Sequence, residues 1–124
     1  MKGILWLSLA EQVSPVDVLY QPSNHLHITL RFNVDFSEVE HLLGREVMVY
    51  CYEDCHNNRI QAVRVQLPAE FHTLCQNESP HMTISHLPNV RPVESNNMLQ
   101  SEHDSLPCDL VLRTVAAFHA FSGT

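Results

Sequence analysis

LHITLRF, residues 26–32, alternates apolar and polar side chains in the way that is typical of a strand with one buried face. Side chains two residues apart leave the same face of a strand, so His25, His27, Thr29 and Arg31 are expected on the polar face. The apolar residues of the stretch, including the phenylalanine at its end, would pack inward. The stretch therefore predicts a half-buried strand that presents imidazole and hydroxyl groups on one surface.

PHMTIS, residues 80–85, repeats this pattern in the second part of the chain. His81, Thr83 and Ser85 are expected on its polar face, and the apolar residues between them would pack inward. With nine His and five Thr in 124 residues, random placement gives about 0.4 His-x-Thr matches, so two copies in an alternating apolar frame exceed chance. His86 would point away from the motif face.

Turn-forming residues and apolar periodicity divide the rest of the chain into short elements. Ser37 is expected to cap a helix that ends at Gly44, and Asp54 to Asn58 reads as a turn. The order of elements suggests an internal duplication with one motif in each half. Strands are expected over residues 3–9, 25–32, 46–52, 60–67, 81–86 and 109–118, and short helices over 37–43, 69–75 and 95–99.

Composition and charge limit the classes of partner. A chain of 124 residues with 44% hydrophobic and 17% charged residues fits one folded domain, residues 1–124. The formal charge of −7 opposes binding of a long duplex nucleic acid. A short or terminal phosphate held by local donors remains compatible with this charge. We expect a monomer.

The apolar stretch at residues 3–10 is too short and lacks the cleavage site of a signal peptide, so it is expected to be a strand. No apolar run approaches the ~18 residues that cross a bilayer. These features predict a cytoplasmic protein without membrane contact. Cys51, Cys55 and His56 resemble half of a zinc site, but no second pair follows, so free thiols are expected.

Two imidazoles that face each other across a cleft suit hydrolysis of a phosphodiester. One neutral histidine takes a proton from water, and the other, protonated, gives a proton to the leaving oxygen. Thr29 and Thr83 can donate hydrogen bonds to the non-bridging phosphate oxygens. This chemistry requires no metal and no cofactor.

The repeated sequences His27-Ile28-Thr29-Leu30 and His81-Met82-Thr83-Ile84 resemble the motifs of the 2H (two-histidine) phosphoesterase superfamily. The stretch from Val63 to Leu99, with VQLP, SPHMTIS and VRPVESNNML, is similar to the second lobe of the cyclic phosphodiesterases associated with RNA and tRNA ligases. The resemblance covers most of the chain, and the two motifs are its most specific part.

The resemblance implies an α+β fold with two lobes, near residues 1–60 and 61–124, related by a pseudo-two-fold axis. Two antiparallel sheets, each flanked by helices, would form a central V-shaped groove. That groove would bind a nucleoside 2′,3′-cyclic phosphate or an RNA end, with His27 and His81 as general acid and base and Thr29 and Thr83 as phosphate ligands. Which histidine plays which part stays open at this point.

Other residues are candidates for contact with the substrate. His25, Arg31 and Ser85 fall on the motif faces, and Tyr20 could stack on a base. Other possible stacking platforms are Trp6, Phe32, Tyr50 and Tyr52, although core packing is the favoured interpretation for each of these aromatic residues.

Three alternatives remain open. The chain could be a phage-type hydrolase of cyclic oligonucleotide defence signals, because its small acidic body suits a small ligand. It could be a module that binds RNA ends without cleaving them, although arginines or helix N-termini serve that purpose better. A metal hydrolase is the third, but Asp35 and Glu78, the nearest carboxylates, share no metal-ligand spacing with the motif histidines.

Overall fold

The strands of the chain are joined into one antiparallel sheet that closes on itself. The computed structural model describes residues 1–121, and in these the strand order is β2-β6-β3-β1-β7-β4-β5, with a further pairing between β5 and β6. The strands are β1 (Lys2–Leu9), β2 (Gln21–Pro22), β3 (His27–Asp35), β4 (Glu46–His56), β5 (Ile60–Gln66), β6 (His81–His86) and β7 (Asp104–Ala120).

Short helices lie at both ends of this barrel-like sheet. They are α1 (Phe36–Val39), which continues as a 3-10 turn over Glu40–Leu42, α2 (Ala69–Leu74), and α3 (Ser95–Gln100), which follows a 3-10 turn over Pro92–Glu94. The fold is α+β, as expected, but one continuous sheet replaces the two expected sheets. The barrel closes because β6 pairs with both β3 and β5. The proposed division into lobes at residue 60 stays a prediction.

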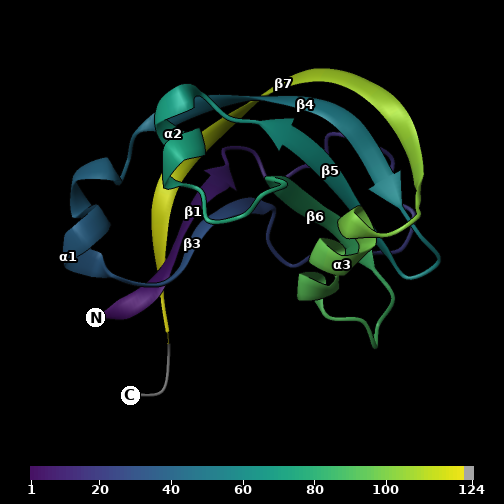
Figure 1. Ribbon diagram of the computed structural model, residues 1–124, viewed down its shortest axis with the longest axis horizontal. Coiled ribbons are helices and arrows are strands. Elements are labelled where there is room, and N and C mark those ends of the chain that lie inside the picture. The colour runs from purple at the N-terminus through teal and green to yellow at the C-terminus, as the bar shows by residue number, and fades with distance from the viewer. Residues whose placement is uncertain (122–124) are drawn as a thin grey trace.

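The two long strands β4 and β7 span the molecule. Figure 1 shows them arching over it, with α1 and α2 on one side and α3 on the other. β7 pairs with β1 through its C-terminal part and with β4 through the rest. Gly3 on β1 pairs with Ala120, and a side chain at Gly3 would collide with the Phe118 ring. The close approach of β1 and β7 therefore requires glycine at this position.

Two hydrophobic clusters hold the structure. The larger fills the barrel interior with residues from six strands and with the apolar faces of α1 and α2, including Val39, Leu42 and Phe71. The smaller lies beneath α3 and contains Cys55, Ile60, Ala62, Val90, Met98 and Leu99. Burial of these apolar side chains is the main favourable term in folding. The larger cluster lies on the side of the molecule with α1 and α2, and the smaller cluster lies on the side with α3. The motif strands β3 and β6 lie between these two sides.

Some expected boundaries were wrong. Asp35, rather than Ser37, caps α1, because its side chain accepts a hydrogen bond from the Ser37 amide while Glu38 accepts one from the Asp35 amide. Gly44, with φ +87°, follows the 3-10 turn as expected.

The first long hairpin also extends further than expected. β4 continues through residues 54–56, where a turn was expected, because it pairs there with both β5 and β7. The turn begins at Asn57, whose side chain accepts hydrogen bonds from the Arg59 and Ile60 amides. β7 likewise starts at Asp104 rather than at Asp109.

Within residues 1–121, no helix has the length and apolar character needed to cross a membrane. In the structure the four cysteines form no disulfide bond within residues 1–121.

Candidate active site

The two His-x-Thr motifs meet at a single point of the sheet. β3 and β6 are joined by one residue pair, Ile28 with Met82, the middle residues of the two motifs. Both side chains are 0% exposed and point into the barrel core. The flanking His and Thr of each motif therefore lie on the opposite face, at the place where the two strands diverge.

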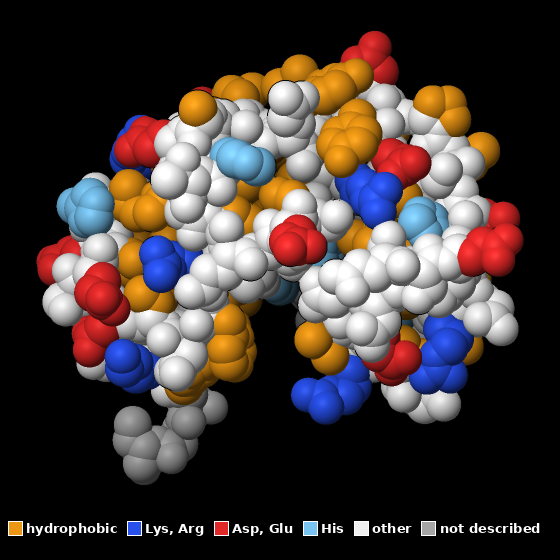
Figure 2. Space-filling model, in the orientation of Figure 1, with side chains coloured by type: hydrophobic (Ala, Val, Ile, Leu, Met, Phe, Trp, Pro, Cys, Tyr) orange, Lys and Arg blue, Asp and Glu red, His pale blue; other side chains and the backbone are white. Residues whose placement is uncertain are grey.

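A groove of about 770 Å³ opens at this junction, a volume within the range of small-molecule sites. Figure 2 shows the molecule hollowed between the side that carries α1 and the side that carries α3. His27, Thr29, His81 and Thr83 all line the groove. The sequence prediction that the two motifs share one cleft is confirmed, while the catalytic roles of these residues stay predictions.

Each motif strand carries a β-bulge one residue after its threonine. On β3 the register moves from Thr29 to Arg31 opposite consecutive residues of β1, and on β6 it moves from Thr83 to Ser85 opposite consecutive residues of β5. A bulge reverses which face the following side chains take. The strict alternation that the sequence predicted therefore stops at Leu30 and Ile84.

The bulges overturn the expected positions of Arg31 and Ser85. Arg31 lies opposite the fully buried Leu5, its Nε atom is buried without a hydrogen-bond partner, and it does not line the groove. Ser85 is 0% exposed and donates a hydrogen bond of 2.7 Å to Gln61. Both were expected on the groove face, and both instead turn away from it.

The next residue along each strand lies on the groove face instead. Phe32 and His86 line the groove, and the Phe32 side chain is 63% exposed. The inward packing expected for Phe32 and the orientation expected for His86 were wrong for the same reason, the reversal caused by the bulges.

Tyr20 also lies outside the groove. Its hydroxyl donates to the carbonyl of Asn57, and its amide donates to the Ser85 hydroxyl. These bonds fix the tyrosine beside the turn between β4 and β5, so the expected contact with a substrate base is not supported.

His27 is held in one tautomer by the preceding residues. Its Nδ1 lies 3.1 Å from the His25 carbonyl oxygen and 3.0 Å from the His25 Nδ1. A carbonyl can only accept, so the Nδ1 of His27 carries the proton and its Nε2 is left with a lone pair. Burial and the neighbouring His25 lower the pKa of His27 to about 4. The imidazole is therefore neutral at pH 7.

A stack of aromatic rings supports His27. The ring centroid of Trp6 on β1 lies 4.0 Å from the ring centroid of His27 and 4.7 Å from those of His25 and His119. His25, which lines the groove as expected, also bonds to the Ser8 hydroxyl at 3.0 Å. The contact of Trp6 and His119 with the first motif was not predicted from the sequence, because it depends on strand pairings between distant segments.

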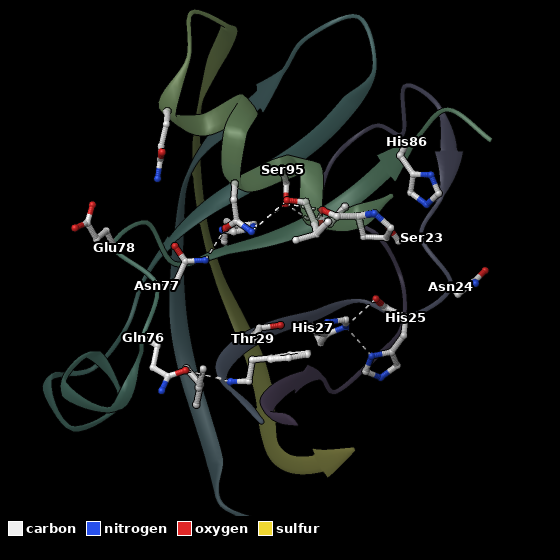
Figure 3. A pocket seen from close by; sticks show the side chains of 18 residues that line it. Ser23, Asn24, His25, His27, Thr29, Gln76, Asn77, Glu78, His86 and Ser95 are labelled. Carbon is white, nitrogen blue, oxygen red and sulfur yellow. Dashed lines mark hydrogen bonds between the residues drawn. The ribbon is translucent and has the colours of Figure 1, made fainter. Parts of the chain in front are cut away.

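His81 is held in the same way but has a different environment. Its Nδ1 lies 2.7 Å from the Ser79 carbonyl oxygen, again two residues earlier, and its Nε2 lies 2.9 Å from the Ser95 hydroxyl. Burial lowers the pKa of His81, the bond to Ser79 raises it, and the charge of Arg64 lowers it further. Figure 3 shows Ser95 on the wall of the groove that faces His27 and Thr29.

Ser95 is a site residue that sequence reasoning missed. It starts α3, is 1% exposed, and its hydroxyl also lies 3.0 Å from that of Thr83. The Thr29 hydroxyl, by contrast, has no hydrogen-bond partner within the described residues, and because Thr29 lines the groove this hydroxyl can donate to a ligand. A serine in a predicted helix carries no sequence signal that it will reach a motif 12–14 residues away.

Polar but mostly uncharged side chains complete the groove. Among the described residues that line the groove, Glu78 is the one carboxylate, and none is a lysine or an arginine. Carboxamide groups come from Asn24, Gln76, Asn77, Asn96 and Gln100. The groove therefore offers neutral donors and acceptors, which suit one phosphate group and a base better than a long polyanion.

The residues that could hold a metal lie elsewhere. In the described part of the chain, the ligand atoms of Glu53, Cys55 and His103 lie within 4.8 Å of one another, but these residues do not line the groove. Glu53 forms an ion pair of 2.9 Å with Arg64, and burial raises the pKa of the Cys55 thiol to about 12. Cys51, whose sulfur lies 3.3 Å from that of Cys108, is not among these three residues.

Residues 33–108 match the family model described as the fungal tRNA ligase phosphodiesterase domain. The chain belongs to this family. It is a family of the 2H phosphoesterase type, which agrees with the resemblance found in the sequence and supports a cyclic phosphodiesterase activity in general. No curated protein matches the chain. The matched region contains the second motif and Ser95, whereas the first motif precedes it.

Proposed function

We propose that this protein is a metal-independent cyclic phosphodiesterase that hydrolyses the 2′,3′-cyclic phosphate of a nucleotide or RNA end to a phosphomonoester. The observation that carries the proposal is the convergence of two His-x-Thr motifs on one groove through the Ile28–Met82 pair. The two imidazoles supply a base and an acid, and two hydroxyls supply donors for a phosphate between them.

The surroundings of the two histidines favour distinct roles. His27 is neutral, and its Nε2 carries a free lone pair, so it is the general base that takes a proton from the attacking water. The water oxygen bonds to phosphorus, the bond from phosphorus to one ribose oxygen breaks, and the Nε2 of His81 gives that oxygen its proton. Thr29 and Thr83 donate to the non-bridging oxygens while negative charge accumulates on them.

The lining of the groove supports a small nucleotide end as the substrate. Phe32 and Val93 expose apolar side chains there, 63% and 57% of their surface respectively, and an aromatic ring can stack on a base. The absence of lysine and arginine from the described lining disfavours a long backbone. The donor set for acid and base chemistry is complete within the groove, which supports metal independence.

Hydrolysis assays with excess EDTA test this proposal. Adenosine 2′,3′-cyclic phosphate, an RNA oligomer ending in a 2′,3′-cyclic phosphate, and a cyclic dinucleotide are compared, with ³¹P NMR to distinguish 2′- from 3′-phosphate products. We expect turnover of the first two. A requirement for added metal, or turnover of the cyclic dinucleotide alone, would overturn the proposal.

A matched pair of variants separates catalysis from binding. His27→Gln should lower kcat about 10³-fold with little change in affinity for the cyclic nucleotide. His72→Gln, on the exposed face of α2 and away from the groove, should leave turnover unchanged. Binding without turnover by the unaltered protein would identify a non-catalytic RNA-end module instead.

A further inference from the structure

The second motif has a partner that the first motif lacks. Ser95 touches both of its polar members, with its Oγ 2.9 Å from the Nε2 of His81 and 3.0 Å from the Oγ1 of Thr83. The geometry points to Ser95 as a positioning residue that accepts a hydrogen bond from the Nε2–H of His81 and so holds this histidine as the proton donor. The assignment rests on the proposed function, because it concerns the acid step of that reaction.

The hydrogen-bond partners of His81 and Ser95 indicate where their protons lie. The Ser79 carbonyl, 2.7 Å from the Nδ1 of His81, can only accept, so Nδ1 carries a proton. The Pro92 carbonyl, 2.8 Å from the Ser95 Oγ, also can only accept, and it takes the single hydroxyl proton of Ser95. The lone pairs of the Ser95 oxygen then face His81 and Thr83, and the Thr83 hydroxyl turns its proton from Ser95 to the phosphate when substrate binds. When His81 carries its second proton, its Nε2–H therefore has an acceptor in the Ser95 oxygen.

In the part of the chain that the structure describes, no charged group around His81 stabilises the protonated form of its imidazole. Arg64 on β5 lies opposite His81 in the register and is itself paired with Glu53. The titratable groups of the groove are His25, His27, His86 and Glu78, and within residues 1–121 none forms an ion pair with His81. A half-buried imidazolium without a carboxylate depends on neutral acceptors. Those acceptors are the Ser79 carbonyl and the Ser95 hydroxyl.

Ser95 also accounts for the division of labour between two similar motifs. The described residues place no hydrogen-bonding group on the Nε2 of His27, which stays free to accept. When His81 has given its proton to the leaving oxygen, its Nε2 holds a lone pair. The Ser95 hydroxyl can then turn its proton from the Pro92 carbonyl to that nitrogen, and exchange with solvent restores both histidines for the next turnover.

Two measurements on Ser95→Ala test the inference. An NMR pH titration of the His81 ring, in protein without substrate, should show its midpoint lowered by about one pH unit, because the charged form loses an acceptor. The alkaline limb of the kcat/KM profile should move down by the same amount, with a loss of about tenfold at pH 7. At the acidic end, where His81 is protonated in both proteins, the rates should converge.

Two further variants guard against a general structural effect. Ser101→Ala removes another serine hydroxyl bonded to a carbonyl next to the same helix, and it should shift neither measurement. Ser95→Thr keeps the hydroxyl and should restore the His81 midpoint.

The outcomes are decisive in each direction. A His81 midpoint that rises in Ser95→Ala would mean that Ser95 donates to the neutral ring, and an unchanged midpoint would mean that it does not act on His81; either result overturns the inference. The NMR titration needs no substrate. Failure of the cyclic phosphodiesterase assay with a lowered midpoint would therefore refute the proposed function and leave the link between Ser95 and His81 intact.

Discussion

The two motifs use one backbone design in two different settings. In both, the histidine Nδ1 bonds to the carbonyl two residues earlier, the middle residue is buried, and a bulge follows the threonine. His27, however, lies against the rings of Trp6 and His25 with its Nε2 free, whereas His81 lies against α3 with Ser95 on its Nε2. The backbone determines the direction of the two imidazoles, and the neighbouring side chains determine which ring nitrogens carry protons.

The largest expected effect tests whether the two histidines act as one unit. His27→Gln and His81→Gln should each reduce kcat about 10³-fold, since either loss removes half of a coupled proton transfer. The double variant should then be little worse than either single variant, because residues that act together are not additive. Steady-state and single-turnover rates on a 2′,3′-cyclic nucleotide measure this. Multiplicative losses would instead show two independent contributions.

A second prediction uses the difference in surroundings. Because the pKa of His27 falls from 6.5 unfolded to about 4 folded, the folded protein binds fewer protons than the unfolded chain between these values. The free energy of unfolding should therefore decrease as the pH falls from 6.5 towards 4, by an amount on the order of 3 kcal/mol from this residue.

Urea denaturation over this pH range provides the measurement. His27→Gln, which cannot gain the proton, should have a smaller pH dependence than the unaltered protein, while His72→Gln should keep it. Equal slopes for the unaltered protein and His27→Gln would show that His27 remains protonatable in the folded state.

The smallest effect tests the bulge on β6. Ser85→Ala removes a buried hydroxyl that bonds to Gln61, and it should lower the free energy of unfolding by about 1–2 kcal/mol. Turnover should change less than about twofold, because the bulge turns this residue away from the groove. Denaturation and kcat measured on the same preparation decide the matter. A large loss of kcat at unchanged stability would restore Ser85 to the groove face.

Much of this site could be predicted from the sequence, because a strand has a fixed period. The alternation in LHITLRF and PHMTIS correctly placed both His-Thr pairs on polar faces and Ile28 and Met82 in the core. That alternation holds only where no β-bulge interrupts the one-to-one pairing of the two strands. It therefore stopped at Leu30 and Ile84, and the positions of Arg31, Phe32, Ser85 and His86 were wrong as a consequence.

Other features depend on partners that no local pattern specifies. The sequence indicated two motif-bearing halves, but closure into one sheet depends on β6 pairing with both β3 and β5. The stack on Trp6 requires β1, β3 and β7 to be neighbours. Ser95 becomes a site residue because the segment from Pro92 to Gln100 folds back over β6.

The Ile28–Met82 pair makes chemistry and folding inseparable in this protein. The same rung that seals the hydrophobic interior fixes the spacing of the reactive groups behind it. A substitution that repacks this pair is expected to shift both imidazoles together, whereas a substitution at the groove rim leaves their spacing unchanged. Selection for activity here also acts as selection for a particular core.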